Sequence, residues 1–476
     1  MPKPSPAAPV AATASDDSDL KIPGSLPPRE DVAALLSSVP QSGVERKGMP
    51  RNGSLNRRGS YRYKSENLAL SSMHSLYAPV ENQVTQYRHG IQDGLEGYHS
   101  WFNVLLIFVP IGILGRLFGL SDTYVFIFNF LACIPLATIL GRATEDIASY
   151  TNDTIGGLIN ATFGNAVELI LSVSALQNGY TSVIKATLVG SVLSNLLLVL
   201  GSSIFCGGVL YAEQEVLPVA VETNANVLQL AVFSFFVPTV MDYVTPDTMK
   251  HKKKTLEVMS LLLAVMMLAI YGMYLFFQLF THIDAFNPDE DEEAGPSEAS
   301  PLTGREDEMS IATVSSEDVE PVATLPVAIA IMVVDVIFVS LCCENLVDTI
   351  EEFSQQVGLD DKFISIILLP IIGNAVEHLS AIIVAMKNKM DLSVGIAAGS
   401  SVQIAVFAAP FMVVLSWLYG PVHLTMALTA LEALCLWMSV GLVNMTLRDA
   451  KTNWFEGAVL LMAYFIVAVA FYLTKG

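Results

Sequence analysis

The sequence contains little charge for its length. Only 15% of its 476 residues are charged, whereas soluble domains carry about 25%. Basic residues are the scarcer kind, with 25 against 46 acidic residues and a formal net charge of −21. That balance argues against nucleic acid and anionic lipid head groups as partners of the whole chain. Because 53% of the residues are hydrophobic, a soluble enzyme of this length could not hide its apolar surface.

Cysteines and catalytic motifs are also sparse. The five cysteines form no CxxC pair and lie inside apolar runs, so we expect small hydrophobic residues rather than a disulfide framework or a metal site. They are Cys133, Cys206, Cys342, Cys343 and Cys435. Neither HExxH nor GxSxG is present, which argues against an intramembrane hydrolase. We therefore expect a protein that is not an enzyme and needs no cofactor.

Long hydrophobic runs predict an all-α polytopic membrane protein. A helix needs about 20 apolar residues to cross a bilayer, and the chain offers about eleven such runs. They lie near residues 101–119, 123–143, 154–177, 183–210, 225–244, 256–281, 324–343, 362–386, 391–418, 422–446 and 454–474. The lipid bilayer is therefore the expected environment of residues 99–476, and the sequence leaves a homo-oligomer open.

Hydrophilic segments set the expected boundaries. Residues 1–98 lack a sustained apolar period and predict a disordered tail, whose basic patch favours a cytosolic N-terminus. Near Ser60 the tail resembles a basophilic kinase site, so a kinase is a candidate partner and the tail is expected to be regulatory. Between the expected repeats, the linker 284–321 contains an acidic run that we expect to respond to Ca²⁺ or to local charge. This run is Asp289, Glu290, Asp291, Glu292 and Glu293.

An internal repeat is the strongest organisational signal. The pentapeptide Gly-Asn-Ala-Val-Glu ends at Glu168 and again at Glu377, an offset of 377 − 168 = 209. Gly190-Ser191 recurs as Gly399-Ser400 at the same offset. After a first transmembrane helix at 99–120, this predicts two transport repeats of five spans each, 121–283 and 322–476. An odd number of spans inverts the second repeat, as in secondary transporters that bind substrate near the midplane.

Loop charges support this topology only in part. With a cytosolic N-terminus, the basic residues near 387–389 and 448–451 fall on the cytosolic side, as the positive-inside rule prefers. The basic run at 250–254 falls on the opposite side. We retain the inverted arrangement because later loops can violate the rule.

Two glutamates inside apolar runs are the principal candidates for ion binding. An ionised carboxylate at the centre of a membrane helix costs about 2.5–3.5 kcal/mol, so Glu168 and Glu377 are functional candidates. The glycine and asparagine before each glutamate are Gly164, Asn165, Gly373 and Asn374. Glycine lets a helix unwind and free its carbonyls, and asparagine offers an amide oxygen. A structural acid is the alternative for one such glutamate, but a symmetric pair favours ion binding.

Polar residues elsewhere in the spans could complete the site. The further candidate ligands are Ser191, Ser400 and Gln403. Candidates for an ion or proton path are Glu145, Ser194, Asn195, Glu344, His378 and Ser401. Helix packing is an equal alternative for the serines. An interfacial role is an equal alternative for Glu145 and Glu344, which lie near predicted span ends, and His378 is more typical of a hydrogen-bonding neighbour.

The expected oxygen ligands indicate which ion the protein transports. Carboxylate, amide, hydroxyl and freed carbonyl oxygens suit Ca²⁺, Mg²⁺ or Mn²⁺ rather than copper or zinc. An empty site with two ionised carboxylates carries two negative charges, which one divalent cation or two protons would neutralise. Because only the neutralised forms are inexpensive to occlude, this arrangement favours exchange of a cation for protons. A Mn²⁺/H⁺ or broad divalent exchanger and a passive cation channel remain alternatives.

At these residues the sequence resembles the vacuolar-type cation/proton exchangers of the calcium/cation antiporter superfamily. Residues 157–168, 369–378 and 399–403 carry the resemblance, which covers about residues 98–476. It implies an eleven-helix fold with the first helix outside two inverted five-helix repeats. It also implies movement of cytosolic Ca²⁺ into an acidic vacuole in exchange for protons, with Glu168 and Glu377 at the central acid positions.

The resemblance also bears on the accessory residues of the site and on the ion that drives transport. Ser191, Ser400 and Gln403 match accessory polar positions of these exchangers. Ser194 stands where the second repeat has Gln403, so exact twofold symmetry of the site is not expected. Sodium-coupled relatives carry Gly-Thr-Ser and Pro-Glu or Pro-Asp at these cores; their absence here favours protons. Autoinhibitory N-terminal tails are frequent among such exchangers.

Overall fold

The computed structural model describes residues 101–151, 153–246, 248, 251–282 and 322–474. The expected tail 1–98 with Ser60, and the linker residues 289–293, lie outside the described residues. In the first half the elements are η1 Trp101–Ile107, α3 Phe108–Leu114, α4 Asp122–Ser149, α5 Asp153–Phe163, α6 Ala166–Gln177, α7 Thr181–Leu193, η2 Ser194–Val199, α8 Leu200–Leu210, β1 Gln214–Glu215, α9 Pro218–Val244, α10 Lys252–Phe276 and η3 Phe277–Thr281.

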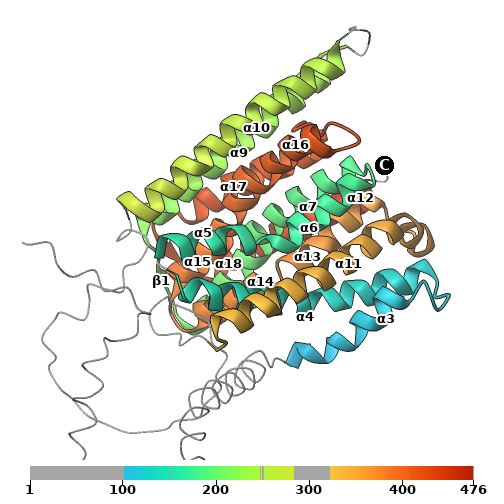
Figure 1. Cartoon of the computed structure of the whole chain (residues 1–476). Coiled ribbons are helices and arrows are strands. Elements are labelled where there is room, and N and C mark those ends of the chain that lie inside the picture. Colours follow the sequence, from blue (N-terminus) through green and yellow to red (C-terminus); the bar gives the residue numbers. More distant parts are fainter. Residues whose placement is uncertain (1–100, 152, 247, 249–250, 283–321, 475–476) are drawn as a thin grey trace, which may run out of the picture. The chain divides into compact units, whose positions relative to one another are not determined.

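The second half is equally helical (Figure 1). Its elements are α11 Leu325–Val357, α12 Asp361–Phe363, η6 Ile364–Leu368, α13 Leu369–Gly373, α14 Ala375–Met386, α15 Met390–Val402, η7 Gln403–Ala408, α16 Ala409–Tyr419, α17 Ala430–Thr446, β2 Lys451–Thr452 and α18 Trp454–Leu473. The expected all-α polytopic fold is confirmed. The only strands among the described residues are β1 and β2, which pair antiparallel as a short ribbon.

The helix boundaries repeat along the chain. Each of α6, α7, η2 and α8 begins and ends 209 residues before α14, α15, η7 and α16, for example 375 − 166 = 209. Even the π-helical turns η2 and η7, which put one extra residue into a helical turn, keep this offset. The duplicated motifs of the sequence therefore belong to duplicated backbone.

The two halves are inverted relative to one another. The equivalent helices α4 and α11 pack together along their lengths. Near the start of α4, the Thr123 hydroxyl donates to the Gln356 side chain near the end of α11. Near the end of α4, Asp146 accepts from the backbone N–H groups of Val322 and Ala323, both at 3.2 Å, just before α11 begins. Equivalent helices therefore run in opposite directions, as the odd number of spans predicts.

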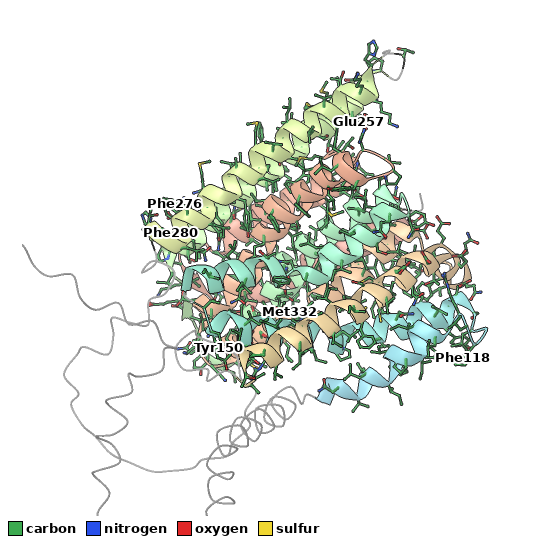
Figure 2. The ribbon with its side chains drawn as sticks, in the orientation of Figure 1. Phe118, Tyr150, Glu257, Phe276, Phe280 and Met332 are labelled. Carbon is green, nitrogen blue, oxygen red and sulfur yellow. The ribbon has the colours of Figure 1, made fainter. Side chains whose placement is uncertain are left out.

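The helices have the length and composition of an integral membrane protein. Seven helices of the described chain are long and apolar enough to cross a bilayer, and an eighth span is bent by 58° between α13 and α14. Three shorter apolar helices include α6 and α17. Large apolar side chains point outward from the bundle; Phe276 and Phe280 are each 58% exposed (Figure 2). A lipid environment accounts for this apolar exterior.

Two span predictions were wrong at their ends. The span expected near 324–343 continues as α11 to Val357, so Glu344 lies within a helix rather than near its end. The span expected near 422–446 begins only at Ala430. Gly420 ends α16 and Pro421 follows it, and proline cannot continue a helical hydrogen-bond pattern. Thr429 then starts α17 with a reciprocal capping box to Glu432.

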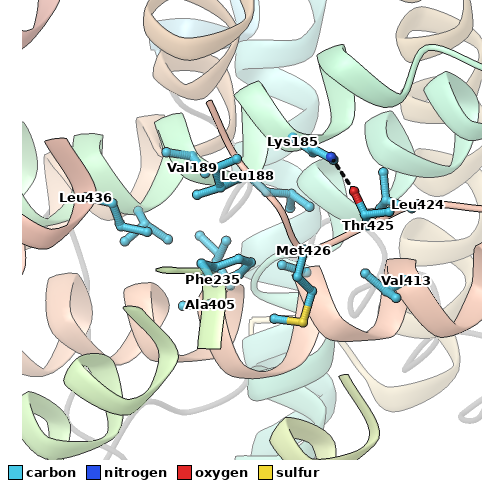
Figure 3. A pocket seen from close by; sticks show the side chains of 14 residues that line it. Lys185, Leu188, Val189, Phe235, Ala405, Val413, Leu424, Thr425, Met426 and Leu436 are labelled. Carbon is cyan, nitrogen blue, oxygen red and sulfur yellow. Dashed lines mark hydrogen bonds between the residues drawn. The ribbon is translucent and has the colours of Figure 1, made fainter. Parts of the chain in front are cut away.

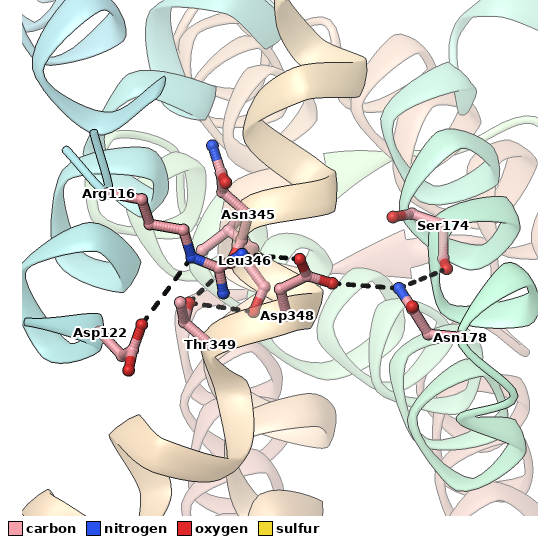
Figure 4. Close-up of polar contacts among 8 residues, drawn as sticks. All are labelled: Arg116, Asp122, Ser174, Asn178, Asn345, Leu346, Asp348 and Thr349. Carbon is pink, nitrogen blue, oxygen red and sulfur yellow. Dashed lines mark hydrogen bonds and ion pairs between the residues drawn. The ribbon is translucent and has the colours of Figure 1, made fainter. Parts of the chain in front are cut away.

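A polar cluster joins the first helix to both repeats (Figure 4). Arg116, which follows α3, lies 3.8 Å from Asp122 of α4 and 2.8 Å from Asp348 of α11. Asp348 also accepts from the Asn178 side chain at 3.2 Å, at the end of α6. The cluster ties helices from distant parts of the sequence at one end of the bundle. Its groups are partly exposed, so its contribution to stability is about 1 kcal/mol or less.

Candidate cation site

The site is built on two helix breaks. The α5–α6 break lies at Gly164-Asn165, and the α13–α14 break lies at Asn374. Asn165 and Asn374 have non-helical backbone angles, φ −107°, ψ 27° and φ −90°, ψ 11°. This region of the map is sparsely populated and recurs at functional residues. Each break gives a new helix N-terminus in the interior of the bundle, as discontinuous transporter helices do.

The two predicted glutamates stand in the first turns of the new helices. Glu168 belongs to the first turn of α6 and Glu377 to that of α14. The partial positive charge of a helix N-terminus offsets some of the cost of holding a carboxylate there. Glu168 Oε1 lies against Gly373, four residues before Glu377, so the two acids come from neighbouring breaks. The structure thus brings together the acids that the repeat predicted.

The Glu168 carboxylate is buried and packs directly on the opposite break. Its side chain is 2% exposed, and a Cβ atom placed on Gly373 would overlap its Oε1. Neither Glu168 oxygen has a hydrogen-bond partner among the described residues, and neither does Oε2 of Glu377. A buried charge without a partner is costly. Two adjacent carboxylates therefore require protons or a cation.

A cavity adjoins Glu168. Its lining includes the hydroxyl residues Thr187 and Ser191 of α7, together with Gly373 and the thiols of Cys133 and Cys343. The hydroxyl oxygens of Thr187 and Ser191 are buried and have no partner within the described part of the chain. Hydroxyl oxygens can accept a cation as well as donate a hydrogen bond. The open oxygens around Glu168 thus come from α6 and α7.

The asparagine at the first break is fully engaged by the second repeat. Asn165 Nδ2 donates to Gln403 Oε1 at 2.6 Å, and its Oδ1 accepts from Ser400 Oγ at 3.0 Å. Ser400 Oγ in turn accepts from Asn195 Nδ2 at 2.9 Å. The four residues form a buried chain of hydrogen bonds across the two repeats.

Within the described chain, the asparagine at the second break forms a hydrogen bond through its amide nitrogen but not through its amide oxygen. Asn374 Nδ2 donates to the backbone oxygen of Ser191 at 3.1 Å. Its Oδ1 is buried without a partner among the described residues. The amide oxygen is thus available beside Glu168 and Glu377 in a way that Asn165 Oδ1 is not.

These donors fit a hard divalent cation. The described residues contain no group of three or more His, Cys, Asp or Glu side chains placed to hold a metal. Two carboxylates must therefore be complemented by neutral oxygens. The buried unpaired ones include those of Thr187, Ser191 and Asn374, and Ser194 Oγ and Asn195 Oδ1 are also unpaired within the described part of the chain. An all-oxygen set with few charges suits Ca²⁺, whose coordination is flexible. Mn²⁺ accepts similar ligands.

The other predicted path residues lie outside this cluster. His378 Nε2 lies 2.8 Å from Ser202 Oγ, as expected of a hydrogen-bonding neighbour. Ser401 Oγ donates to the Ala397 carbonyl at 2.8 Å, a helix-internal contact. Ser194 Oγ is buried without a hydrogen-bond partner among the described residues, and Ser194 does not line the Glu168 cavity. The exposed Glu344 and the half-buried Glu145 do not line the Glu168 cavity.

The sequence analysis missed three polar residues inside the spans. Thr187 lines the Glu168 cavity, Asp335 is buried in α11, and Lys185 is half-buried in α7. Asp335 and Lys185 are charged residues inside apolar runs, the same signal that singled out Glu168. Thr187 carries no such signal, because hydroxyl residues are common in membrane helices.

Lys185 lines a second, mainly apolar cavity (Figure 3). Its Nζ donates to Thr425 Oγ1 at 2.8 Å and to the Ala427 carbonyl at 2.7 Å. These bonds hold the segment between α16 and α17 against α7. The surrounding walls are side chains such as Leu188, Phe235 and Met426. A cationic group among apolar walls does not suit a divalent cation, so this cavity is separate from the ion site.

Known proteins share this fold and sequence pattern. A Ca²⁺/H⁺ antiporter of Aphanothece halophytica is 38% identical over 368 residues, which cover 77% of this chain and 95% of that protein. A vacuolar calcium ion transporter of Schizosaccharomyces pombe is 37% identical over 374 residues, 78% of this chain and 85% of that protein. The solved structure of YfkE, named as a Ca²⁺/H⁺ antiporter protein, shows 35% identity and a TM-score of 0.63, and covers 78% of this chain and 99% of YfkE.

A family model matches both repeats and omits the linker. The matched residues are 121–280 and 327–473, which contain both helix breaks and both central glutamates. This match spans more than half of the chain, and the expected resemblance is confirmed. The chain belongs to the sodium/calcium exchanger protein family.

Proposed function

We propose that this protein is a secondary active antiporter that moves Ca²⁺ out of the cytosol in exchange for H⁺. The observation that carries the proposal is a pair of carboxylates at two helix breaks, the buried Glu168 and the half-buried Glu377, without a cationic partner among the described residues. Each carboxylate comes from one inverted repeat. The site therefore lies where the two halves can move relative to one another.

Charge neutrality would couple the two ions. With both carboxylates ionised, the empty site holds two negative charges in a region of low dielectric, where an unbalanced charge is costly. One Ca²⁺ or two protons removes this cost. The site can then be occluded and reopened on the other side when loaded, whereas the empty charged site resists this movement. Net transport becomes exchange of one ion type for the other.

Neutral oxygens would complete the Ca²⁺ coordination. Ser191 Oγ, Thr187 Oγ1 and Asn374 Oδ1 are the unpaired candidates that lie at the Glu168 cavity or at the second break. In the first repeat, Gln403 and Ser400 instead hold Asn165 through hydrogen bonds. We assign Gln403, Ser400 and Asn195 to positioning Asn165, and Gly164 and Gly373 to forming the breaks.

The names of the relatives support protons rather than sodium as the coupling ion. Both protein relatives above match most of their length, and one is named a Ca²⁺/H⁺ antiporter and the other a vacuolar calcium ion transporter. A vacuolar cation/proton exchanger of Arabidopsis thaliana is 40% identical over 372 residues. We infer an acidic organelle of the vacuolar type as the location and a cytosolic N-terminus. The tail near Ser60 and the acidic run 289–293 remain proposed regulatory elements.

Transport by the purified full-length protein tests this function. The protein is reconstituted into liposomes that contain a trapped Ca²⁺ indicator and have an acidic interior. Ca²⁺ uptake should follow the pH gradient and stop when an ionophore collapses it. Uptake that follows only the membrane potential would indicate a channel, and uptake that requires internal Na⁺ would indicate sodium coupling. Competition by Mn²⁺ at equal concentration would indicate a broad divalent exchanger.

A further inference from the structure

Asp335 is an intramembrane acid that the proposed mechanism does not yet use. It lies in α11, its side chain is 4% exposed, and its Oδ2 has no hydrogen-bond partner among the described residues. Its neighbours Val334 and Ile337 are 52% and 54% exposed, whereas Val339 and Cys342 are buried. Asp335 is therefore turned away from the lipid-facing side of α11 and into the protein. An acid in this position is expensive unless it has a function.

No positive charge compensates Asp335 within the described chain. Its own helix and α4 contribute the buried, uncharged residues Cys342 and Cys133 toward the glutamate site. Toward its end α4 contributes Arg142, Glu145 and Asp146, and Asp146 binds the backbone of Val322 and Ala323 rather than Asp335; α6 contributes Glu168. The charged groups near α3 and α12, Arg116, Asp361 and Lys362, lie toward the opposite end of α11. A proton is the simplest neutralising group.

The position of Asp335 along α11 is informative. Cys343, eight residues later, lines the Glu168 cavity, which places Asp335 about 12 Å from that level along the helix axis at 1.5 Å per residue. In the other direction, α11 begins at Leu325, ten residues or about 15 Å along the axis from Asp335, and Ala323 just before it binds Asp146 at the end of α4. Asp335 thus stands between the glutamate site and one membrane end of the α4–α11 pair.

The end of the α4–α11 interface that contains Asp335 differs from the equivalent end that contains Phe126. By the repeat offset of 209 residues, Asp335 is equivalent to Phe126, and Phe353 is equivalent to Thr144. Phe126 and Phe353 stack at 4.0 Å between ring centroids and close one end of the α4–α11 interface. At the opposite end, the equivalent positions hold a carboxylate and a hydroxyl, and both residues are buried. These equivalent positions therefore hold an aromatic pair in one case and two buried polar residues in the other.

We propose that Asp335 binds and transfers protons on a route between the Asp146 end of the α4–α11 interface and Glu168. This inference rests on the proposed exchange function and adds a residue to it. When Ca²⁺ enters, the O–H bond of Glu168 breaks and its proton is passed toward Asp335. Asp335 releases its own proton toward the membrane end and takes up the arriving one, so that it returns to its starting state. Loading by protons uses the same steps in reverse.

The test compares Asp335→Asn with the exposed carboxylate variant Glu352→Gln of the same helix, in full-length protein reconstituted as above. Asp335→Asn should reduce the rate of pH-driven Ca²⁺ uptake about tenfold or more, in the range of lost proton-transfer groups. The remaining rate should lose most of its dependence on pH, while Ca²⁺ binding without a gradient stays unchanged. Asp335→Glu should recover much of the rate, and Glu352→Gln should match the wild type.

Infrared difference spectra give a readout that does not depend on transport. A protonated carboxyl band of the wild type should disappear in Asp335→Asn and change frequency in Asp335→Glu. An Asp335→Asn protein with wild-type rate and pH profile would overturn the proposal, as would a carboxyl band that neither variant alters. If the wild type itself shows no pH-driven uptake, the exchange function fails instead. If Asp335→Asn does not fold, the frequency change and rate of Asp335→Glu decide between the outcomes.

Discussion

The two helix breaks share one backbone plan and differ in how their side chains are used. At the α5–α6 break, both ends of the Asn165 amide are bound by residues of the second repeat. At the α13–α14 break, Asn374 Oδ1 is unpaired among the described residues and stands with the open oxygens of Ser191 and Glu168. One break is therefore a rigid hydrogen-bonded support, and the other offers ligands. The two repeats thus share the position of the helix break but differ in which polar oxygens are left without a hydrogen-bond partner among the described residues.

The glycines show the same difference. Gly190 and Gly399 are equivalent by the offset of 209, yet only Gly190 lies against another helix. A Cβ atom at Gly190 would overlap the Ile366 carbonyl and the Pro370 ring, whereas nothing lies within 4 Å of one at Gly399. Close approach of helices through glycine is common in membrane proteins. Equivalent sequence positions thus serve different contacts in the two halves.

The largest expected effect is on folding, from Gly190→Ala. The new methyl group meets a backbone carbonyl, so α7 and the η6–α13 segment must separate at a cost of about 1–3 kcal/mol or more. Gly399→Ala is the matched control and should be neutral or slightly stabilising, because alanine favours helix. Thermal stability in detergent, followed by size-exclusion chromatography, measures the difference. Equal melting temperatures for the two variants would contradict the asymmetric packing.

Gly373→Ala should fold but transport poorly. The added methyl group overlaps the end of the flexible Glu168 side chain, which can move away at little cost to the fold. Its carboxylate then leaves the position facing Glu377, and a displacement of this kind can cost about 100-fold in rate. Ca²⁺ uptake and melting temperature are measured on the same preparation. Wild-type uptake would show that the Glu168 position is not critical.

A smaller and more informative effect should separate the two asparagines. Asn165→Ala removes both hydrogen bonds that this side chain makes, worth about 1 kcal/mol each, and should lower stability more than Ca²⁺ affinity. Asn374→Ala loses one hydrogen bond and one free oxygen, so it should weaken Ca²⁺ affinity roughly tenfold, about 1.4 kcal/mol, with less effect on stability. Ca²⁺ titration and thermal melting of both variants test this contrast. The reverse pattern would reassign the ligand oxygen to Asn165.

Much of this fold and the centre of its site follow from the sequence. Apolar run length predicted most spans, and the repeated Gly-Asn-Ala-Val-Glu pentapeptide predicted both breaks and both glutamates. The extension of α11 to Val357 was missed because charged residues such as Asp348, Glu351 and Glu352 interrupt the apolar run after Glu344, although Leu346, Ile350 and Phe353 are buried on one face of the same helix. The bond from Asn165 to Gln403 joins residues 238 apart in sequence, so only tertiary structure could reveal it. The inward orientation of Asp335 depends on which face of α11 meets α4.

Replacement of the two central glutamates tests the account most directly. Glu168→Gln and Glu377→Gln nearly preserve shape and keep one oxygen ligand, and an uncharged amide is less costly than a carboxylate in the membrane. Ca²⁺ uptake into acidified liposomes is measured at matched protein level, with Asp289→Asn in the linker as the control. The account predicts that either glutamine variant inserts and folds but loses uptake, while Asp289→Asn transports almost normally. Near-normal uptake by either glutamine variant would contradict exchange through a pair of carboxylates.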